Sequence, residues 1–260
     1  MPVTSMTLSR PAATWRRLCR PAMLFGALLA VAGWWRSDQL PPPETLLPQA
    51  IVEPIEVAVS EPEFRKTAGG YEYVVRPRYS YEISGLVASL HHSDAWWDTD
   101  HRDEHDKLNV ADLCMVWGQN ASSGVYRRLR FSNTQWTCHV EFRSSEDGNA
   151  FVRTQMSNNH VLADSPDIER ELMAIRVGEQ VRLRGWLVDY ATLEQGRIFS
   201  TRNTSHGHNG ENCEVLYVTS VEHLRPAPHT IWQLLIWLGI SLSAVSAVGS
   251  MLLAPEHWEA

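Results

Sequence analysis

One short segment of the chain gathers most of the residues that could bind a metal or transfer protons. Ten of the sixteen residues from 91 to 106 are histidine, aspartate or glutamate. Imidazole and carboxylate ligands suit zinc, nickel or copper. The candidate ligands for zinc or another divalent transition metal in this segment are His91, His92, His101, Glu104 and His105. A solvated acidic loop is the alternative interpretation of the same residues.

Residues 101–105 also contain the HxxEH pattern of the inverzincin metalloproteases. In those enzymes the two histidines hold zinc on a helix, and the glutamate activates water. Such a motif needs a well-packed helix, but here further acids crowd it and few apolar residues stand at helical spacing. The context therefore argues against proteolysis, and it leaves a structural or regulatory metal site and a solvated loop open.

Other residues with chemical potential lie outside this segment or at its edge. His206 and His208 stand in a loop rich in glycine and asparagine, and they would join a metal site if both loops met at one end of a barrel. His160 follows two asparagines and could act as an acid or base, or belong to a polar helix cap. Trp96 and Trp97 could stack on a ligand, enter a membrane surface, or fasten the acidic loop to the core.

Two apolar runs flank the middle of the chain. The first, residues 21–36, follows a basic head at 1–20, and it is either a cleaved signal sequence or an uncleaved transmembrane anchor. The second, residues 230–254, has no charged side chain over twenty-five residues and predicts a transmembrane helix, which leaves a short tail at 255–260. Small residues four apart predict close helix packing in a hairpin or a homo-oligomer. These residues are Ala22, Gly26 and Ala30 in the first run, and Gly239, Ser243 and Ala247 in the second.

The distribution of charge predicts the orientation. Residues 1–36 contain five arginines and no acid, whereas the whole chain has a net charge of −7. Because arginines beside a span stay in the cytoplasm, we expect the chain between the helices on the periplasmic side of a bacterial inner membrane. The excess of acids argues against nucleic acid as a partner.

The cysteines fit such an exported domain. Cys114, Cys138 and Cys213 all lie between the two apolar runs, where an oxidising compartment would favour one disulfide. Cys114 and Cys138 fall in predicted strands separated by a hairpin arm, so we expect this pair to bond. Cys213 would then be a buried thiol, a cross-link between two copies, or the true partner of one of the other two.

Between the apolar runs, composition divides the chain into a stalk, a domain and a linker. Residues 37–69 are rich in proline and glutamate and predict an extended stalk, and residues 226–229 form a short linker. The domain at 70–225 shows mostly strand patterns, including a hairpin formed by 125–131 and 136–142. One helix is predicted, capped by Asp164 or Ser165 and ended by Gly178, and residues 157–163 could add a helical turn before it.

The fold class predicted is mainly β with one or two short helices, flanked by two transmembrane helices. Residues 83–87 and 183–188 each resemble the glycine-bent long strand of an OB-type barrel. A mixed antiparallel sheet with glycine bulges is the alternative. In residues 112–118 and 157–160 the chain also resembles a group of uncharacterised bacterial membrane-anchored proteins with an OB-like domain, a resemblance that implies no activity.

The leading functional expectation is a membrane-tethered, non-enzymatic periplasmic domain. It would bind a ligand or an envelope protein, serve as an accessory subunit, or form a homo-oligomer. The alternative is a metal-binding envelope protein, either a metal-dependent hydrolase or a metal sensor, built on loop 91–106 with His206 and His208. Serine nucleophile elbows, P-loops and GxGxxG sequences are absent, so no motif demands a cofactor.

Overall fold

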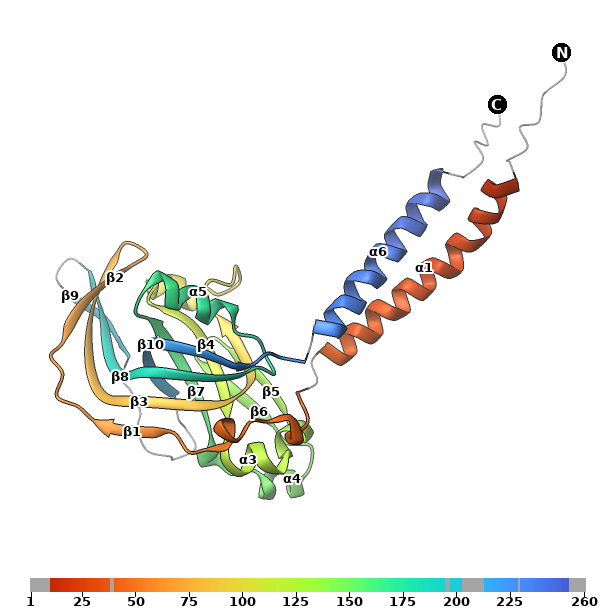
Figure 1. Cartoon of the computed structure of the whole chain (residues 1–260). Coiled ribbons are helices and arrows are strands. Elements are labelled where there is room, and N and C mark those ends of the chain that lie inside the picture. Colours follow the sequence, from red (N-terminus) through yellow and green to blue (C-terminus); the bar gives the residue numbers. More distant parts are fainter. Residues whose placement is uncertain (1–9, 38–39, 195–196, 203–212, 229, 253–260) are drawn as a thin grey trace, which may run out of the picture. The chain divides into compact units, whose positions relative to one another are not determined.

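The chain divides into two compact units. The computed structural model describes residues 10–37, 40–194, 197–202, 213–228 and 230–252. The first unit combines the two ends of the chain, residues 1–39 and 229–260, and the second comprises residues 40–228 (Figure 1). The division agrees with the sequence, in which two apolar runs at the ends of the chain flank a strand-rich middle.

The first unit consists of two long helices. Helix α1 spans Arg10–Ser37 and helix α6 spans Thr230–Leu252. Within them Leu18–Arg36 and Ile231–Met251 are long and apolar enough to cross a membrane, judged by length and composition. Two apolar helices were expected at these places, and α1 begins earlier than the apolar run because alanine and arginine are good helix formers.

Small residues bring α1 and α6 into backbone contact. A Cβ on Gly26 would lie 2.6 Å from the Gly239 carbonyl oxygen, and a Cβ on Gly239 would lie 2.4 Å from that of Gly26. The Ser243 hydroxyl donates a hydrogen bond to the Met23 carbonyl oxygen over 3.1 Å. The small faces predicted from sequence are therefore used between the two helices of one chain.

The second unit is built on a mixed eight-stranded sheet. Its strands are β1 (Ile55–Ala58), β2 (Phe64–Ala68), β3 (Tyr71–His92), β4 (Asn109–Val116), β7 (Met156–Ala163), β8 (Gln180–Glu194), β9 (Arg197–Arg202) and β10 (Cys213–Arg225). The order is β1-β3-β4-β7-β10-β8-β9, β2 pairs with β3, and β3 also pairs with β8. Hydrogen bonding therefore runs from β3 through β4, β7, β10 and β8 back to β3. Among these pairings β7 and β10 are parallel, and the others are antiparallel.

Two glycines lie where long strands approach their neighbours closely. A Cβ on Gly185 of β8 would lie 1.9 Å from the Tyr217 carbonyl oxygen, and one on Gly85 of β3 would lie 2.9 Å from that of Val116. The β8–β10 register shifts between Val218 and Ser220, next to Gly185. The glycines predicted to bend these strands thus lie at close backbone contacts that a larger residue would disturb.

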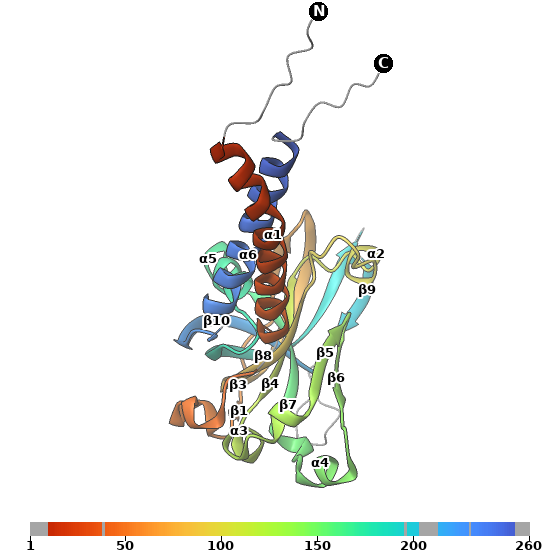
Figure 2. The same ribbon diagram turned by 90° about the vertical axis from the view of Figure 1, so that its right-hand side faces the viewer.

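Short helices and a hairpin complete the second unit. The helices are α2 (Asp100–Asp103), α3 (Gly118–Ser123), α4 (Ser145–Ala150) and α5 (Pro166–Ala174). In the predicted helix α5 the Ser165 hydroxyl accepts from the Ile168 backbone N–H, while Leu172 and Ile175 are buried in the core. Strands β5 (Arg130–Thr134) and β6 (Thr137–Glu141) form a separate two-stranded hairpin (Figure 2).

Two local expectations differ from the structure. Residues 157–163, considered as a helical turn, belong to strand β7, which pairs with β4 on one side and β10 on the other. The predicted hairpin strand at 125–131 begins only at Arg130, because residues 125–128 form a 3-10 turn. At 157–163 partners distant in the sequence decide the conformation, and local propensity cannot report them. The turn at 125–128 instead begins at the left-handed Gly124 and is held by local backbone hydrogen bonds.

Residues 40–69 also differ from the expected stalk. Strands β1 and β2 both pair with β3, and Ala50 is completely buried. The Leu47 backbone N–H donates to Gln180 Oε1 over 2.7 Å, and Trp117 Nε1 donates to Glu53 Oε2 over 2.8 Å. Two of the prolines begin short 3-10 helices, Pro43–Thr45 and Pro48–Ile51. The rest of the segment is extended and covers β3, whose free hydrogen-bonding groups would otherwise meet solvent.

The substitution Gly185→Ala should destabilise the second unit. The new Cβ would collide with the Tyr217 carbonyl oxygen, so we expect the free energy of unfolding to fall by roughly 1–3 kcal/mol. Gly148→Ala is the matched control, because its nearest contact would be an ordinary 3.9 Å to Phe142. Urea unfolding of the full chain in detergent measures both variants, and equal midpoints would contradict the prediction.

Candidate functional site

The polar side chains of the candidate site begin on one face of the β4–β7 pair. Asp112 on β4 and His160 on β7 stand directly opposite each other in the antiparallel register. Such residues have Cβ atoms about 4.5–5.5 Å apart, so their side chains meet. His160 Nδ1 lies 2.6 Å from Asp112 Oδ1, and both residues are buried. The register therefore creates a buried histidine–aspartate pair.

The Asp112 carboxylate has three hydrogen-bond partners. Besides His160, Asn109 Nδ2 donates to Oδ1 over 3.0 Å, and the Trp136 backbone N–H donates to Oδ2 over 3.0 Å. Burial raises the pKa of Asp112, but the charge and hydrogen bond of His160 and the amide of Asn109 outweigh burial, and the pKa lies below its usual value. The side chain is therefore a charged carboxylate removed from water, and it depends on these donors.

Asn109 connects this pair to a second one. Its Nδ2 also lies 2.9 Å from His101 Nε2. Since the Asp112 carboxylate can only accept, Asn109 must present its NH₂ group, and His101 Nε2 must accept from it. The ring proton of His101 is then on Nδ1, which donates to Asp98 Oδ2 over 2.7 Å. The network thus assigns the tautomer of His101.

Asp98 lies between two histidines, His91 and His101. His91 Nε2 lies 2.6 Å from Asp98 Oδ2, and the backbone N–H of His101 donates to Oδ1 over 3.0 Å. Burial raises the pKa of Asp98, yet the hydrogen bonds from His91 and His101 prevail and the pKa is lowered. Six buried side chains are therefore connected, and we call them the buried polar network. Its members are His91, Asp98, His101, Asn109, Asp112 and His160.

The β5–β6 hairpin covers this network. The Trp136 ring, at the hairpin turn, lies 3.7 Å from the His101 ring between centroids and 5.5 Å from that of His160. The predicted disulfide Cys114–Cys138 is present and ties β6 to β4. Asn158 Nδ2 donates to the Trp136 carbonyl oxygen over 3.1 Å. Covalent and polar contacts thus hold the tryptophan over the two histidines.

Of the predicted metal ligands, the structure brings His91 and His101 together. His91 Nε2, His101 Nδ1 and a carboxylate oxygen of Asp98 all lie within 4.8 Å of one another, and the three residues are buried. Asp98 belongs to the acidic segment, but the sequence did not single it out from the neighbouring acids. The available signal for Asp98 was that it precedes His101 by three residues. This spacing allows its carboxylate to accept from both the His101 backbone N–H and the ring.

The other predicted ligands in the segment lie elsewhere. His92 is half-buried, and burial lowers its pKa. Helix α2 ends at Asp103, so the HxxEH residues do not share one continuous helix. Glu104 is exposed, and His105 has a left-handed backbone with φ of 56° and stacks on Tyr71. The five-residue pattern therefore does not form the helical zinc site of an inverzincin.

The remaining site predictions have different outcomes. His206 and His208 lie outside the described residues. The Trp97 ring contacts that of His91 with centroids 4.7 Å apart, as expected if it fastens the loop to the core. Trp96 is 88% exposed. Trp97 is also exposed, at 46%, but one side of its ring packs beside the network, whereas Trp96 is almost wholly presented to solvent.

The donor set would hold zinc only after rearrangement. Zinc would need the lone pair of His101 Nδ1, which carries the ring proton. To move that proton to Nε2, Asn109 would have to turn its oxygen toward His101, and the same oxygen would then face Asp112 Oδ1. Because two acceptors repel, Asp112 disfavours the metal-binding tautomer.

The sequence did not assign Asp112, Asn109 or Trp136 to a site, and it left the role of His160 open. The available signal was the resemblance itself, which was noted in residues 112–118 and 157–160. These two stretches pair with each other in the sheet, and they contain Asp112 and His160. Comparison of the chain with family models, with curated proteins and with solved structures gave no match. The functional argument therefore depends on the geometry.

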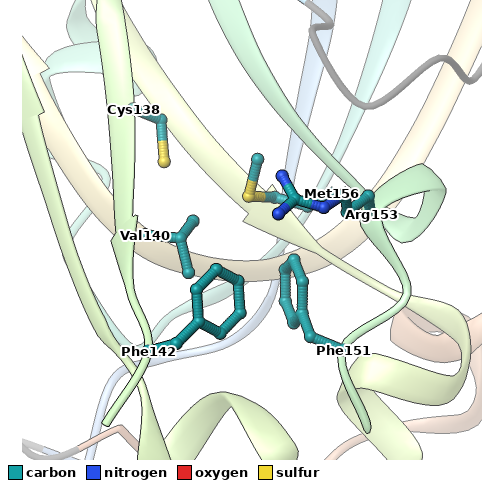
Figure 3. Close-up of a pocket in the computed structure, with 6 residues that line it drawn as sticks. All are labelled: Cys138, Val140, Phe142, Phe151, Arg153 and Met156. Carbon is teal, nitrogen blue, oxygen red and sulfur yellow. The ribbon is translucent and has the colours of Figure 1, made fainter. Parts of the chain in front are cut away.

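A small cavity lies between the hairpin and the adjoining turn. It has a volume of about 140 Å³ and is lined by Cys138, Val140, Phe142, Phe151, Arg153 and Met156 (Figure 3). The Phe142 and Phe151 rings lie edge to face with centroids 5.6 Å apart, and the Arg153 guanidinium lies 5.8 Å from the Phe142 ring centroid. Ligand pockets usually measure about 300–1,000 Å³, so this space suits hairpin packing better than a ligand.

Glu214 is a buried acid next to Cys213 in the sequence. It is 4% exposed, and its Oε2 has no hydrogen-bond partner among the described residues. Burial, and then the charge of Glu56, raise the pKa of Glu214 to about 8. Asp112 raises the pKa of His160 to about 9 although burial opposes it. At neutral pH the folded chain therefore holds a proton on each group.

The raised pKa values of Glu214 and His160 predict that the folded chain loses stability as the pH rises from about 4.5 to about 9. The unfolded chain loses the Glu214 proton above about pH 4.5, while the folded chain keeps it until about 8, so stability falls across this window. The contribution of His160 is complete below pH 6.5 and is lost as the pH rises through about 9. Glu214→Gln should flatten the lower window and leave the upper one. Urea midpoints between pH 5 and 9 measure this, and an unchanged slope between pH 5 and 8 in the variant would contradict the assignment.

Proposed function

We propose that the chain is a membrane-tethered protein of the bacterial envelope, with α1 and α6 in the inner membrane and residues 40–228 in the periplasm. The arginines before the first span and the acidic charge between the spans support this orientation. The Cys114–Cys138 disulfide suits an oxidising compartment. Close packing of α1 on α6 would hold both ends of the domain at one place in the membrane.

We further propose that strands β3, β4, β7, β10 and β8 form an OB-like barrel. The pairing that returns to β3 supports closure, as do the glycines at the close contacts of β3 and β8. Helix α5 follows β7 in sequence and packs into the core, which agrees with a five-stranded barrel carrying one helix. The uncharacterised membrane-anchored proteins that the sequence resembles would share this plan.

The function that we propose for the domain is binding of an envelope protein through the loop at residues 93–108, beside the buried polar network. The network carries the proposal, because it buries two charged carboxylates where apolar side chains would give comparable stability at lower desolvation cost. Trp97 joins the network, and its neighbour Trp96 is exposed to solvent. Exposed tryptophans beside a rigid support are typical anchors of protein interfaces.

A photo-crosslinking amino acid at position 96 should capture this partner in membranes. The same amino acid at Arg170, an exposed position on α5, is the matched control and should give no product. Trp96→Ala should weaken co-purification of the captured protein by roughly tenfold, as expected for an interface anchor worth 1–2 kcal/mol. Crosslinks of equal yield at both positions, or to a second copy of the chain, would argue against a separate partner at this loop.

Metal binding is the second candidate function, because three buried ligand atoms converge at His91, Asp98 and His101. Zinc there would support the metal-sensor or hydrolase alternative. The tautomer imposed by Asn109 and Asp112 favours the hydrogen-bonded cluster instead.

Metal content of the full chain, purified in detergent without chelator or affinity histidines, separates the two functions. We expect less than about 0.1 zinc per chain, since His101 Nδ1 is a donor in the network. About one zinc per chain that is lost in His101→Ala and retained in His92→Ala would establish the metal site. His92 is the matched control because it is adjacent to His91 and is not one of the three converging ligands.

A further inference from the structure

The buried polar network ends at a thiol. Cys213 is the first residue of β10, it is outside the disulfide, and it is half-buried. In the parallel β7–β10 register Cys213 pairs with Asn158, and Val215 pairs with His160. Since side chains two residues apart point to the same face of a strand, Cys213 and His160 share a face. The Cys213 Sγ lies 3.6 Å from the Trp136 carbonyl oxygen, so the thiol is under the same hairpin turn as the imidazole.

Both the Asp112 carboxylate and the Cys213 side chain act on the His160 imidazole. Nδ1 is occupied by Asp112, 2.6 Å away. Among the groups that raise the pKa of His160 are Asp112 and a hydrogen bond with the Cys213 side chain. Since Nδ1 faces Asp112, Nε2 is the nitrogen that remains for the thiol. Imidazole therefore stands between a thiol and a buried carboxylate, the order of groups that nucleophilic catalysis requires.

Asp112 is suited to hold the imidazole in place. Its carboxylate is fixed by the Asn109 side chain and the Trp136 backbone N–H, and it cannot turn away without leaving those donors unpaired. A protonated imidazole beside a thiol stabilises the thiolate, which is the nucleophilic form. Partial exposure of Cys213 gives a reactant a route that the fully buried end of the network at His101 does not offer.

The arrangement fits acyl transfer better than disulfide chemistry. Formation of a new disulfide would need a second free thiol, but Cys114 and Cys138 are bonded to each other and Cys19 lies in the apolar helix α1. A histidine oriented by a carboxylate is useful when a proton must be held and then delivered to a leaving group. Esters and amides have such leaving groups.

We propose that Cys213 is a nucleophile that accepts the acyl group of an ester or amide, with His160 as the acid–base and Asp112 as its positioning residue. The sulfur forms a bond to the carbonyl carbon, the bond to the leaving group breaks, and His160 gives its proton to the departing alcohol or amine. Water then attacks the thioester and gives a proton to His160, which releases the carboxylic acid and restores the thiolate. This goes beyond the binding function, because it needs only these three side chains.

The first test is the reactivity of the thiol in the full chain in detergent. At pH 6.5, iodoacetamide should alkylate Cys213 about tenfold faster in the folded chain than in the same chain unfolded in urea, where the thiol is ordinary. In His160→Gln this advantage should vanish, and the rate should rise with pH as for a simple thiol. Slower alkylation in the folded chain, or the same pH profile in folded His160→Gln, would overturn the proposal.

The second test uses p-nitrophenyl acetate as the acyl donor. We expect a burst of about one p-nitrophenolate per chain, with an acetyl group on Cys213 detected by mass spectrometry. Cys213→Ser, which is nearly isosteric, should give neither signal, and Cys19→Ser should give both. Rapid alkylation without an acetylated Cys213 would refute acyl transfer, and acetylation at another residue would do the same. Asp112→Asn should slow the burst, and urea unfolding shows whether that variant is folded.

Discussion

The polar face of the second unit depends on one buried carboxylate, that of Asp112. An ionised carboxylate away from water is stable only when donors replace its hydration. Strand β7 provides His160, the first residue of β4 provides the Asn109 side chain, and the β5–β6 hairpin provides the backbone N–H of Trp136. If any of these elements moved, the carboxylate would lose one of its three donors. The Cys114–Cys138 disulfide anchors the hairpin close to this contact.

The same requirement explains why an acidic segment folds as a tight loop. Most acids between residues 93 and 108 are exposed, but Asp98 and Asp106 are buried. Asp98 accepts from two imidazoles and a backbone N–H, and Asp106 accepts from the Tyr190 hydroxyl. Asn109 then couples Asp98, through His101, to Asp112. A loop that would otherwise repel itself is therefore drawn onto β4, and the orientation of each imidazole follows from the carboxylate beside it.

The two ends of the network differ in what they can do. At one end His91, Asp98 and His101 satisfy one another, and their burial leaves no open position for a reactant. At the other end His160 stands beside Cys213, which is half-buried. Covalent chemistry therefore fits the Cys213 end, whereas the His101 end gives rigidity. Trp96 is exposed on the loop that the rigid end supports, and this is the surface that we propose for a partner.

The sequence by itself determined the features that depend on local pattern. These are the two apolar helices, the capped helix α5, and the glycines of β3 and β8. The sequence favoured the Cys114–Cys138 disulfide but left Cys213 as an alternative partner, and the structure decided between them. Only the tertiary structure decided that residues 40–69 cover β3 and that 156–163 form a strand. It alone joined Asp112, His160 and Cys213. Their meeting depends on the register of β4, β7 and β10, and a shift of one residue would turn His160 to the opposite face.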